Sequence, residues 1–366
     1  MWVLGACALA ILPAVAQTSE HDAFVLSPFE TQPQFLSGER YSEGWDQYFL
    51  FDDGSLLSTH FVVTNFGIGE HRGLVIGTLV GADGTTLTIK NGRARRDWSH
   101  APDGLDLRIA SHQLSEHAGR YRLSLNNASG EVEVDFHAVA EPWRIGRTWE
   151  SADAKEYQRV SVYAPAANAT GRFRLGPRSG GDPVNEPWSV LGQGSGFGLR
   201  YVNSVALALI ATDWVRVFPL RGEQTLAPAL NVLSKTVGGR SAQFAIVNRE
   251  TGRLLHADEV AVEYDSIEHA GHRGRIYDVP NKFSARGQGP GFSFSGTIVP
   301  VRFIHAFDLV EELKPIERFF VQFTKTPVHF RYLADYDIDF ASEGTTSRLT
   351  GKALVEILSL NGRTAD

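Results

Sequence analysis

Apolar and polar residues alternate along most of the chain, and turn sequences interrupt the alternation at short intervals. Residues 45–51 and 55–64, for example, flank the turn Asp52-Asp53-Gly54. A period of two places successive side chains on opposite faces, as in an antiparallel strand with one wet and one dry face. The pattern therefore predicts two successive runs of short antiparallel strands, with almost no helix.

The turns divide each run into its expected strands. Those of the first run are residues 45–51, 55–64, 73–80, 85–90, 105–110, 120–125 and 131–139. Those of the second run are residues 201–210, 214–219, 226–234, 241–247, 254–264, 275–283, 292–303, 328–340 and 349–360. Asn91-Gly92 predicts a hairpin turn. Residues 305–323 have near-helical apolar spacing and predict one short helix, which Pro315 breaks or starts.

We therefore predict an all-β protein of two tandem antiparallel β-barrels, with one short helix in the second. A proline-rich stretch at residues 141–192 separates the runs, and we interpret it as the last strand of one domain and the crossover to the next. The expected domains are residues 35–185 and 186–362. Barrels of about eight strands are wide enough to hold an apolar ligand.

The first residues resemble an export signal. Residues 2–16 carry no charge and end in Ala14-Val15-Ala16, which predicts a signal peptide of residues 1–16 and a periplasmic or secreted protein. No basic residue precedes the apolar run, so the true start could lie upstream. A lipoprotein site at Cys7 ranks second, and a buried N-terminal strand is the other alternative.

The net charge and the scarcity of sulfur-containing residues argue against some partners and some kinds of catalysis. With 35 basic and 42 acidic residues the net charge is −7, which disfavours nucleic acid as a partner. Cleavage after Ala16 would remove Cys7 and Met1, the only sulfur-containing residues, and with them any thiol chemistry. The 12 histidines follow no metal-binding spacing, although three pairs could meet in space: His112/His117, His269/His272 and His305/His329. We predict no metal and no cofactor.

Several short motifs, in this order, resemble the tandem lipocalin-like superfamily, which includes the Svf1-like proteins, the AttH-like proteins and the hydroxyneurosporene synthase (carotenoid 1,2-hydratase) branch. The similarity covers most of residues 40–361. The motifs of the first half are Trp45-x-x-Tyr48-Phe49-x-Phe51-x-x-Gly54 and Phe61-Val62-Val63-Thr64-Asn65-x-Gly67. Those of the second half are Gly194-x-Gly196 followed by Trp214-Val215-Arg216, which resembles the entry strand pair, then Tyr277-Asp278-Val279-Pro280, residues 309–318, residues 327–336, and Gly351-Lys352-Ala353-Leu354-Val355-Glu356.

This resemblance implies two lipocalin-like barrels that enclose or border an apolar cavity. It also implies binding of lipids or isoprenoids, on which some members catalyse hydration, cyclisation or pericyclic steps. The catalytic branch carries a Gly-Tyr-x-Asp-His-x-Trp-like run, whereas residues 196–203 here read Gly-Phe-Gly-Leu-Arg-Tyr-Val-Asn. The acid/His pair of that run is absent, which argues against carotenoid-hydratase activity.

The candidate ligand-binding residues are Trp214, Arg216, Tyr201, Asn203, His60 and Asn65. Trp214 and Arg216 share a strand face, either as an apolar wall with an anion-binding head or as a structural cation–π stack that closes the barrel end. His60 lies on a wet face or in a polar patch inside the barrel, and Asn65 foremost caps a strand. Apolar walls are expected from Phe61, Phe218 and Phe294.

Three functions remain open. The first is an exported protein that binds a hydrophobic small molecule, a lipid or isoprenoid, with peripheral membrane contact as a further expectation. The second is a cyclase, hydratase or isomerase acting on an isoprenoid or polyketide-like substrate. The third is a structural envelope protein with filled barrels. A buried ionisable residue with a shifted pKa would favour the second function. The oligomeric state stays open.

Overall fold

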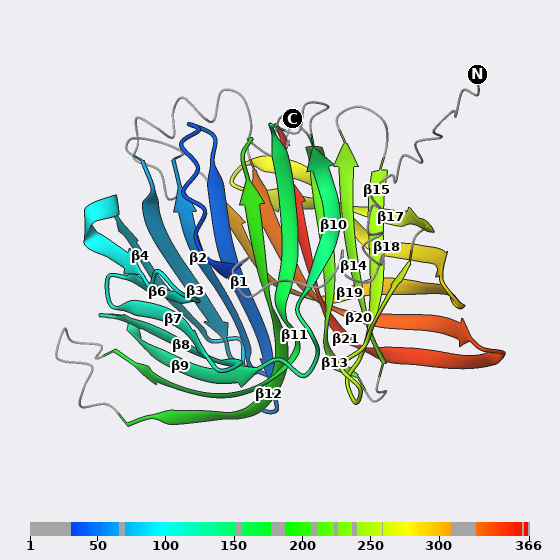
Figure 1. The fold of residues 1–366 in the computed structure, drawn as a ribbon, viewed down its shortest axis with the longest axis horizontal. Coiled ribbons are helices and arrows are strands. Elements are labelled where there is room, and N and C mark those ends of the chain that lie inside the picture. The colour runs from blue at the N-terminus through cyan, green and yellow to red at the C-terminus, as the bar shows by residue number, and fades with distance from the viewer. Residues whose placement is uncertain are drawn as a thin grey trace, which may run out of the picture.

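Two large antiparallel sheets contain nearly all of the described chain (Figure 1). The structure is a computed structural model that describes residues 31–65, 70–150, 155–176, 187–205, 211–222, 226–235, 240–257, 259–308, 327–360 and 362–364. Strand alternation explains this all-β architecture, and the predicted fold class is confirmed. None of the helices in the described residues is long and apolar enough to span a bilayer.

The first sheet has twelve strands in the order β4-β3-β2-β1-β12-β11-β9-β8-β7-β6-β5, and β10 pairs separately with β11. Its strands are β1 Ser42–Phe51, β2 Leu56–Thr64, β3 Arg72–Val80, β4 Thr86–Arg93, β5 Trp98–His100, β6 Asp106–Ile109, β7 His112–His117, β8 Arg120–Asn127, β9 Gly130–His137, β10 Trp143–Glu150, β11 Tyr157–Leu175 and β12 Ser189–Asn203. A short 3₁₀ turn, η3 Arg95–Asp97, leads into β5.

The second sheet has ten strands in the order β16-β15-β14-β13-β21-β20-β19-β18-β17, and β22 pairs with β18. Its strands are β13 Ala211–Gly222, β14 Leu226–Lys235, β15 Arg240–Asn248, β16 Leu254–Ala257, β17 Glu259–His272, β18 Arg275–Gly289, β19 Phe292–Asp308, β20 Val328–Ser342, β21 Thr345–Ser359 and β22 Arg363–Thr364.

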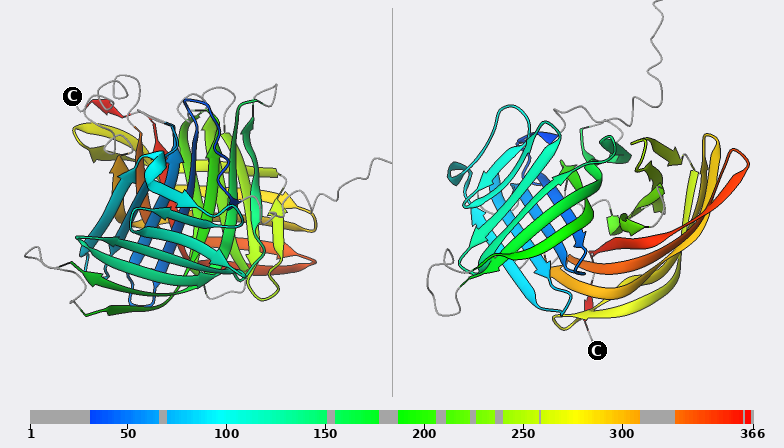
Figure 2. Two further views of the ribbon diagram at one scale, coloured as in Figure 1. Left: turned by 60° about the vertical axis from the view of Figure 1, so that its left-hand side comes forward. Right: turned by 90° about the horizontal axis from the view of Figure 1, so that it is seen from below.

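Each sheet curls, as the right-hand view of Figure 2 shows from below, and its inner face carries an apolar core of its own. The first core includes Trp45, Phe49 and Phe61, and the second includes Phe244 and Phe294, whose rings stack at 3.6 Å. In the second sheet, β16 pairs with β15, and β17, one residue further along the chain, pairs with β18. Strands β16 and β17 are the two edge strands of this sheet order, so their direct succession along the chain brings the two edges of the sheet together.

The division between the sheets differs from the predicted domain boundary. Strand β12 lies between β1 and β11 in the first sheet, and its pairing with β1 extends over ten residues, from Ser42↔Asn203 to Phe51↔Gly194. The chain therefore passes from one sheet to the other between Asn203 and Ala211, after the boundary expected at residues 185/186. Gly194-x-Gly196, interpreted from the sequence as the start of the second barrel, belongs to the first.

Two local predictions were wrong. Asn91-Gly92 lies inside β4, where Leu74 of β3 pairs with Gly92, so the β3–β4 ladder continues past the turn signal. Residues 305–308, predicted to begin a helix, form the end of β19, paired with β20. The rest of the expected helix, at residues 309–323, lies outside the described residues, as does the expected signal peptide.

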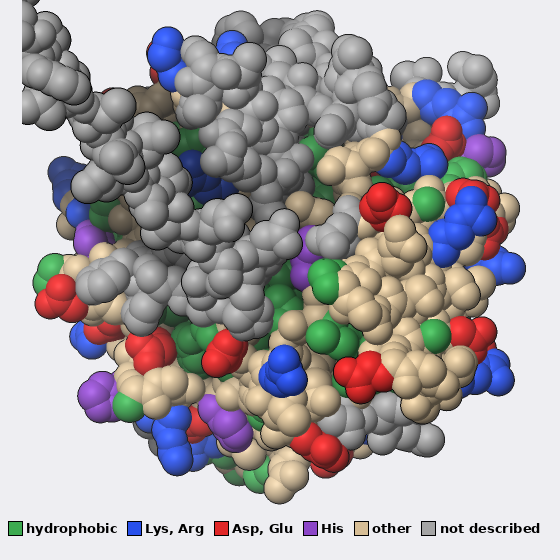
Figure 3. All heavy atoms as spheres, turned by 45° about the vertical axis from the view of Figure 1, so that its right-hand side comes forward, with side chains coloured by type: hydrophobic (Ala, Val, Ile, Leu, Met, Phe, Trp, Pro, Cys, Tyr) green, Lys and Arg blue, Asp and Glu red, His purple; other side chains and the backbone are tan. Residues whose placement is uncertain are grey.

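The surface and the strand faces differ in polarity. On the side shown in Figure 3, acidic and basic side chains are interspersed over the described surface. The strands β1, β2 and β12 of the first sheet and β13, β20 and β21 of the second turn one face inward to their own core. Their opposite faces meet between the sheets, where aromatic and aliphatic side chains form a third buried cluster.

Candidate active site between the two sheets

The cluster between the sheets surrounds a group of buried polar side chains. Its apolar members come from both sheets: the rings of Phe197 on β12 and Phe218 on β13, for example, lie 4.1 Å apart. Eight polar side chains lie among them, which we call the interface network: Asp46, Tyr48, His60, Arg216, His305, His329, Arg331 and Glu356.

One row across the second sheet supplies half of this network. The ladders pair His305 with Arg331, Arg331 with Glu356, Glu356 with Arg216, and Arg216 with Asn231. Directly paired residues of neighbouring strands point to the same face of a sheet. The row therefore faces the first sheet as a unit.

The first sheet contributes Asp46 and His60, which are paired on β1 and β2. Asp46 Oδ1 lies 2.7 Å from His60 Nδ1, and His60 Nε2 lies 2.5 Å from Nη2 of Arg331 on the other sheet. A guanidinium can only donate, so Nε2 of His60 accepts and Nδ1 carries the proton that is donated to Asp46. The network thus fixes the tautomer of His60 and joins the two sheets.

Glu356 is the centre of the second sheet's half of the network. Its carboxylate accepts from Arg331 Nε at 3.3 Å, from His329 Nδ1 at 2.8 Å and from the hydroxyl of Tyr48, and Arg216 Nη1 lies 3.7 Å away. Burial opposes ionisation of Glu356, but Arg331, His329 and Arg216 outweigh it and hold its pKa well below the usual range. Burial, aided by Glu356, raises the pKa of Tyr48 well above that of a free phenol.

Arg216 lies between the two carboxylates. Its guanidinium carbon is 3.3 Å from the ring centroid of Trp214, and Nη1 is 3.4 Å from Asp46 Oδ2. The Tyr201 ring lies 5.7 Å from the same guanidinium. The indole N–H of Trp214 in turn donates to the side-chain oxygen of Asn231. Asp46 and Glu356 together balance the charges of Arg216 and Arg331, as buried ions require.

His305 differs from the other imidazoles of the interface network because one of its nitrogens is buried without a partner among the described residues. Its Nε2 accepts from Nη1 of Arg331 at 2.7 Å, so Nδ1 carries the hydrogen. This Nδ1 has no hydrogen-bond partner within the described part of the chain. Burial, followed by Arg331 and His60, lowers the pKa of His305 to about 2. His305 is therefore neutral at physiological pH and can donate its Nδ1–H.

His329 has the complementary arrangement. Its Nδ1 donates to the ionised Glu356, which leaves the lone pair on Nε2. Burial lowers the pKa of His329, although Glu356 raises it in part. Phe307 lies beside both His329 and His60, with ring centroids 6.4 Å from each. The site thus combines an imidazole lone pair and an imidazole N–H in an apolar setting.

Four of the six sequence-predicted site residues meet here: Trp214, Arg216, Tyr201 and His60. His60 lies neither on a wet face nor inside a barrel, because the second sheet covers the outer face that carries it. Trp214 and Arg216 do stack, but Arg216 faces two carboxylates and is not a free positive charge for an acidic ligand.

The other two predicted residues lie elsewhere. The Asn65 side chain donates to the carbonyl oxygens of Leu36 and Gly38 at 2.9 Å, which is the capping role expected for it. Asn203 is bonded to Ser42 at the end of the β1–β12 pair. The expected apolar wall does not form either: Phe61 and Phe294 belong to separate barrel cores, and Phe218 lies between the sheets.

Asp46, Glu356 and Arg331 were missed by the sequence analysis, although the sequence holds a signal for one of them. Glu356 stands alone in an apolar strand, and its same-face neighbours Leu354 and Leu358 are apolar too. A charged residue between apolar neighbours at i±2 cannot lie on a solvated face. The face must then be covered by another part of the protein, and the charge must be paired.

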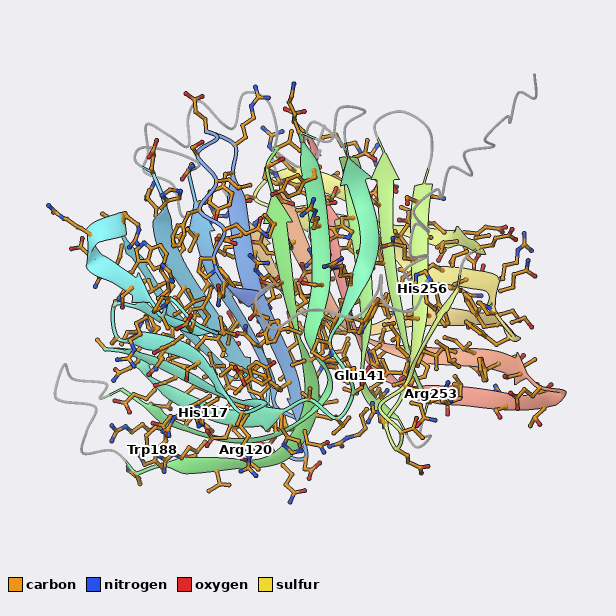
Figure 4. The ribbon with its side chains drawn as sticks, in the orientation of Figure 1. His117, Arg120, Glu141, Trp188, Arg253 and His256 are labelled. Carbon is orange, nitrogen blue, oxygen red and sulfur yellow. The ribbon has the colours of Figure 1, made fainter. Side chains whose placement is uncertain are left out.

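Of the three histidine pairs considered, His305 and His329 bond to the two members of one ion pair, Arg331 and Glu356. His112 is buried in the first barrel, where its Nδ1 accepts from the Asn126 N–H at 3.0 Å, whereas His117 lies at an exposed hairpin with Arg120 (Figure 4). In the described residues, no three His, Cys, Asp or Glu side chains are arranged to hold a metal ion.

No protein-family model matches the sequence, and no curated protein matches it. Solved structures do. An AttH-type protein from Nitrosomonas europaea aligns with a TM-score of 0.57 and 15% identity over 96% of this chain and 99% of that chain. CghA, in a crystal structure with Sch210972, aligns with a TM-score of 0.60 and 12% identity over 88% and 89%. Kievitone hydratase from Nectria haematococca aligns with a TM-score of 0.54 and 11% identity over 92% and 93%.

The chain has the tandem lipocalin-like fold. At 11 to 15% identity this likeness is one of fold, and it confirms the resemblance that the order of the short motifs indicated. In this tandem lipocalin-like chain two buried acid/His pairs, Asp46–His60 and Glu356–His329, lie between the sheets. They lie on strands other than the one that carries the Asp-His run of the carotenoid-hydratase branch.

Proposed function

We propose that this protein is an enzyme of the hydratase, cyclase or isomerase kind, which acts by acid–base chemistry on an apolar, carbonyl-bearing substrate between its two barrels. The observation that carries the proposal is a pair of neutral imidazoles bonded to the Arg331–Glu356 ion pair: His329, with a lone pair on Nε2, and His305, with a buried N–H that has no partner among the described residues. General acid–base catalysis needs such groups held in a dry, fixed geometry.

In the proposed reaction His329 Nε2 removes a proton from the carbon next to the substrate carbonyl. The Nδ1–H of His305 donates to the carbonyl oxygen and stabilises the negative charge that develops there. The imidazolium of His329, stabilised by Glu356, then returns the proton to carbon, at the same or at another position. Return at another position is an isomerisation. For a hydration, His329 Nε2 instead takes its proton from the attacking water, whose oxygen bonds to the β-carbon of the conjugated double bond, and the imidazolium then delivers that proton to the α-carbon.

Arg331 and Asp46 act through the histidines. Arg331 donates to both His60 and His305, and so holds each imidazole with its hydrogen on Nδ1. Among the described residues, only His60 uses that hydrogen within the protein, in its bond to Asp46. Arg331 is therefore a positioning residue, and His305 is the member of the network that can donate to a substrate.

Two further considerations support an enzyme over a pure binding protein. A protein that only binds an apolar ligand needs apolar contact and one or two polar groups, whereas this interface buries a charge-balanced network with three imidazoles. Among the proteins of similar fold, one is by name a hydratase and another was crystallised with Sch210972. The apolar interiors of both barrels are occupied by their own side chains, so we place the substrate between the barrels.

The test is a screen of prenylated and polyketide-type α,β-unsaturated ketones in D₂O, followed by mass spectrometry for gain of water and for deuterium bound to carbon. We expect turnover of at least one compound, and we expect His329→Gln to slow it by roughly 10²–10⁴-fold. The matched control is His269→Gln, because His269 is also bonded to a carboxylate, Asp278, at 2.8 Å, but on the exposed surface. Equal turnover by His329→Gln would overturn the proposal. Binding of these ketones without turnover would favour the binding protein.

A further inference from the structure

A second feature of the molecule lies at the rim of the second barrel, in the turn after β15. The side-chain oxygen of Asn248 accepts from the N–H groups of Glu250 and Thr251 at 3.0 Å, which fixes the turn. Glu141, which lies between β9 and β10 of the first sheet, donates its N–H to the carbonyl of Gly252 at 3.4 Å. Figure 4 shows this meeting point near the labelled Glu141 and Arg253. Arg249 lies in this turn, directly after Asn248.

Two N–H groups of the Arg249 side chain lack hydrogen-bond acceptors among the described residues. Its Nε and Nη2 atoms are buried and have no hydrogen-bond partner among the described residues, and the hydroxyl of Tyr336 is buried without a partner as well. The two groups are close enough to influence each other: the pKa of Arg249 is lowered by burial and raised in part by Tyr336, with no carboxylate among its causes. A guanidinium is always charged, so this rim holds a positive charge that no described acidic side chain balances.

The backbone leaves room for the Tyr336 hydroxyl. A Cβ added at Gly222 or at Gly351 would lie 2.4 or 2.6 Å from that oxygen, so a side chain at either position would displace it. Tyr336 pairs with Gly351 across β20 and β21, and Gly351 pairs with Gly222 across β21 and β13. The lack of a side chain at these two paired glycines thus leaves the space that the phenol occupies.

This rim is separate from the interface network. Tyr336 follows Arg331 by five residues on β20, which places it about 17 Å further along the strand. Its side chain also belongs to the core of the second barrel, on the opposite face of the sheet from Arg331. The unsatisfied donors at the rim therefore need an explanation of their own.

We infer that Arg249 and Tyr336 form a binding site for an oxyanion, a carboxylate or phosphate group. The Nε–H and Nη2–H of a guanidinium form two parallel donors that match two oxygens of such a group. The Tyr336 hydroxyl supplies a third donor. The anion balances the charge of Arg249 and satisfies all three donors at once. It is either a free small anion or the head group of an amphiphile, whose apolar chain would stay at the rim because the barrel interior is filled by its own side chains.

The test is the melting temperature of the full chain during titration with acetate, phosphate or octanoate, at constant ionic strength maintained with chloride. A ligand that binds only the folded state raises the melting temperature as its concentration increases. We expect such a rise for the wild type and none for Arg249→Gln. We expect Tyr336→Phe to bind the anion roughly 5- to 10-fold more weakly, as loss of one neutral hydrogen bond implies. The control is Arg348→Gln, because Arg348 is exposed and paired with Asp337.

The anions distinguish the two sources. Tighter binding of octanoate than of acetate identifies an amphiphile head group, whereas similar binding of acetate and phosphate identifies a free small anion. Should Arg249→Gln not fold, Arg249→Lys, which keeps the charge but not the fork, tests the same point and is expected to lose at least tenfold in affinity. A wild type that responds to none of the three anions, or an Arg249 variant that responds equally, overturns the inference. Neither result depends on turnover at the interface network.

Discussion

The guanidinium of Arg331 on the second sheet donates to Nε2 of His60 on the first sheet across 2.5 Å. Two residues 271 positions apart in the sequence thus share a buried hydrogen bond, and the same guanidinium also bonds His305 and Glu356. This one side chain therefore couples the packing of the two barrels to the protonation pattern of the proposed active site.

Replacement of Arg331 by Met should destabilise the protein strongly. The variant would leave the carboxylate of Glu356 buried with one of its two guanidinium partners missing, and loss of one partner of a buried ion pair costs about 3–5 kcal/mol. Urea unfolding measures the change in the free energy of unfolding. Arg348→Met serves as the control, since the Arg348–Asp337 pair is exposed and should leave the unfolding midpoint unchanged. A loss no larger than that of the control would contradict the importance of the network.

The buried imidazole of His305 should make stability depend on pH below neutrality. Its pKa is about 2 in the folded protein and about 6.5 in the unfolded chain, so only the unfolded chain gains a proton as the pH falls from 6.5 towards 2. The contribution of His305 to stability is full above pH 6.5 and is lost below it.

His305→Gln isolates this effect, because glutamine titrates in neither state. Between pH 8 and pH 5, the stability of the wild type relative to the variant should fall by about 2 kcal/mol, which is roughly 1.5 pH units at 1.36 kcal/mol each. Chemical denaturation at the two pH values measures the difference. A constant difference across this range would show that His305 takes up its proton in the folded protein as well.

Strand alternation allowed most of the fold to be predicted from the sequence, because it reports which residues share a face. It does not report which strands pair at a distance. Strand β12 was assigned to the second barrel because the chain enters it after a proline-rich stretch, yet its ladder partners are β1 and β11. Asn91-Gly92 was misread for a related reason: the pairing of Leu74 with Gly92 outweighs the local turn preference.

The site was predicted in part for the same reason. Trp214 and Arg216 were predicted to lie together because residues i and i+2 of one strand share a face, which the local sequence alone determines. The row His305–Arg331–Glu356–Arg216 depends on the register between four strands, which the sequence does not contain in local form. The packing of the outer face of β2 against the second sheet, which buries His60, is likewise a relationship between two domains.

Tyr48 should contribute to the cohesion of the two barrels. Its hydroxyl donates to Glu356 on the other sheet, and a hydrogen bond to a charged group contributes about 1.5–3 kcal/mol. Tyr48→Phe should therefore destabilise by this amount in urea unfolding. In a double-mutant cycle with Glu356→Gln, the coupling between the two changes should exceed about 0.5 kcal/mol.

Tyr121→Phe is the matched control for this cycle. Tyr121 is also a buried tyrosine, but its hydroxyl donates to the neutral carbonyl of Tyr163 inside the first barrel. Its replacement should cost about 0.5–1.5 kcal/mol and show no coupling to Glu356→Gln. Equal coupling for Tyr48 and Tyr121 would mean that Glu356 affects global stability without a specific bond to Tyr48.

Gly44 leaves the space that the Tyr201 ring occupies beside Arg216. The two residues are paired across β1 and β12, and a Cβ at Gly44 would lie 2.5 Å from the Cζ atom of the Tyr201 ring. The ring is half-buried and packs against the cluster between the sheets, so Gly44→Ala should cost about 1–3 kcal/mol through overpacking. Gly271→Ala is the control, because a Cβ there meets nothing within 4 Å. The double variant Gly44→Ala/Tyr201→Ala separates the causes: if the clash is with the ring, adding Gly44→Ala to Tyr201→Ala should have little further effect on stability, whereas an undiminished effect would place the strain in the backbone of β1.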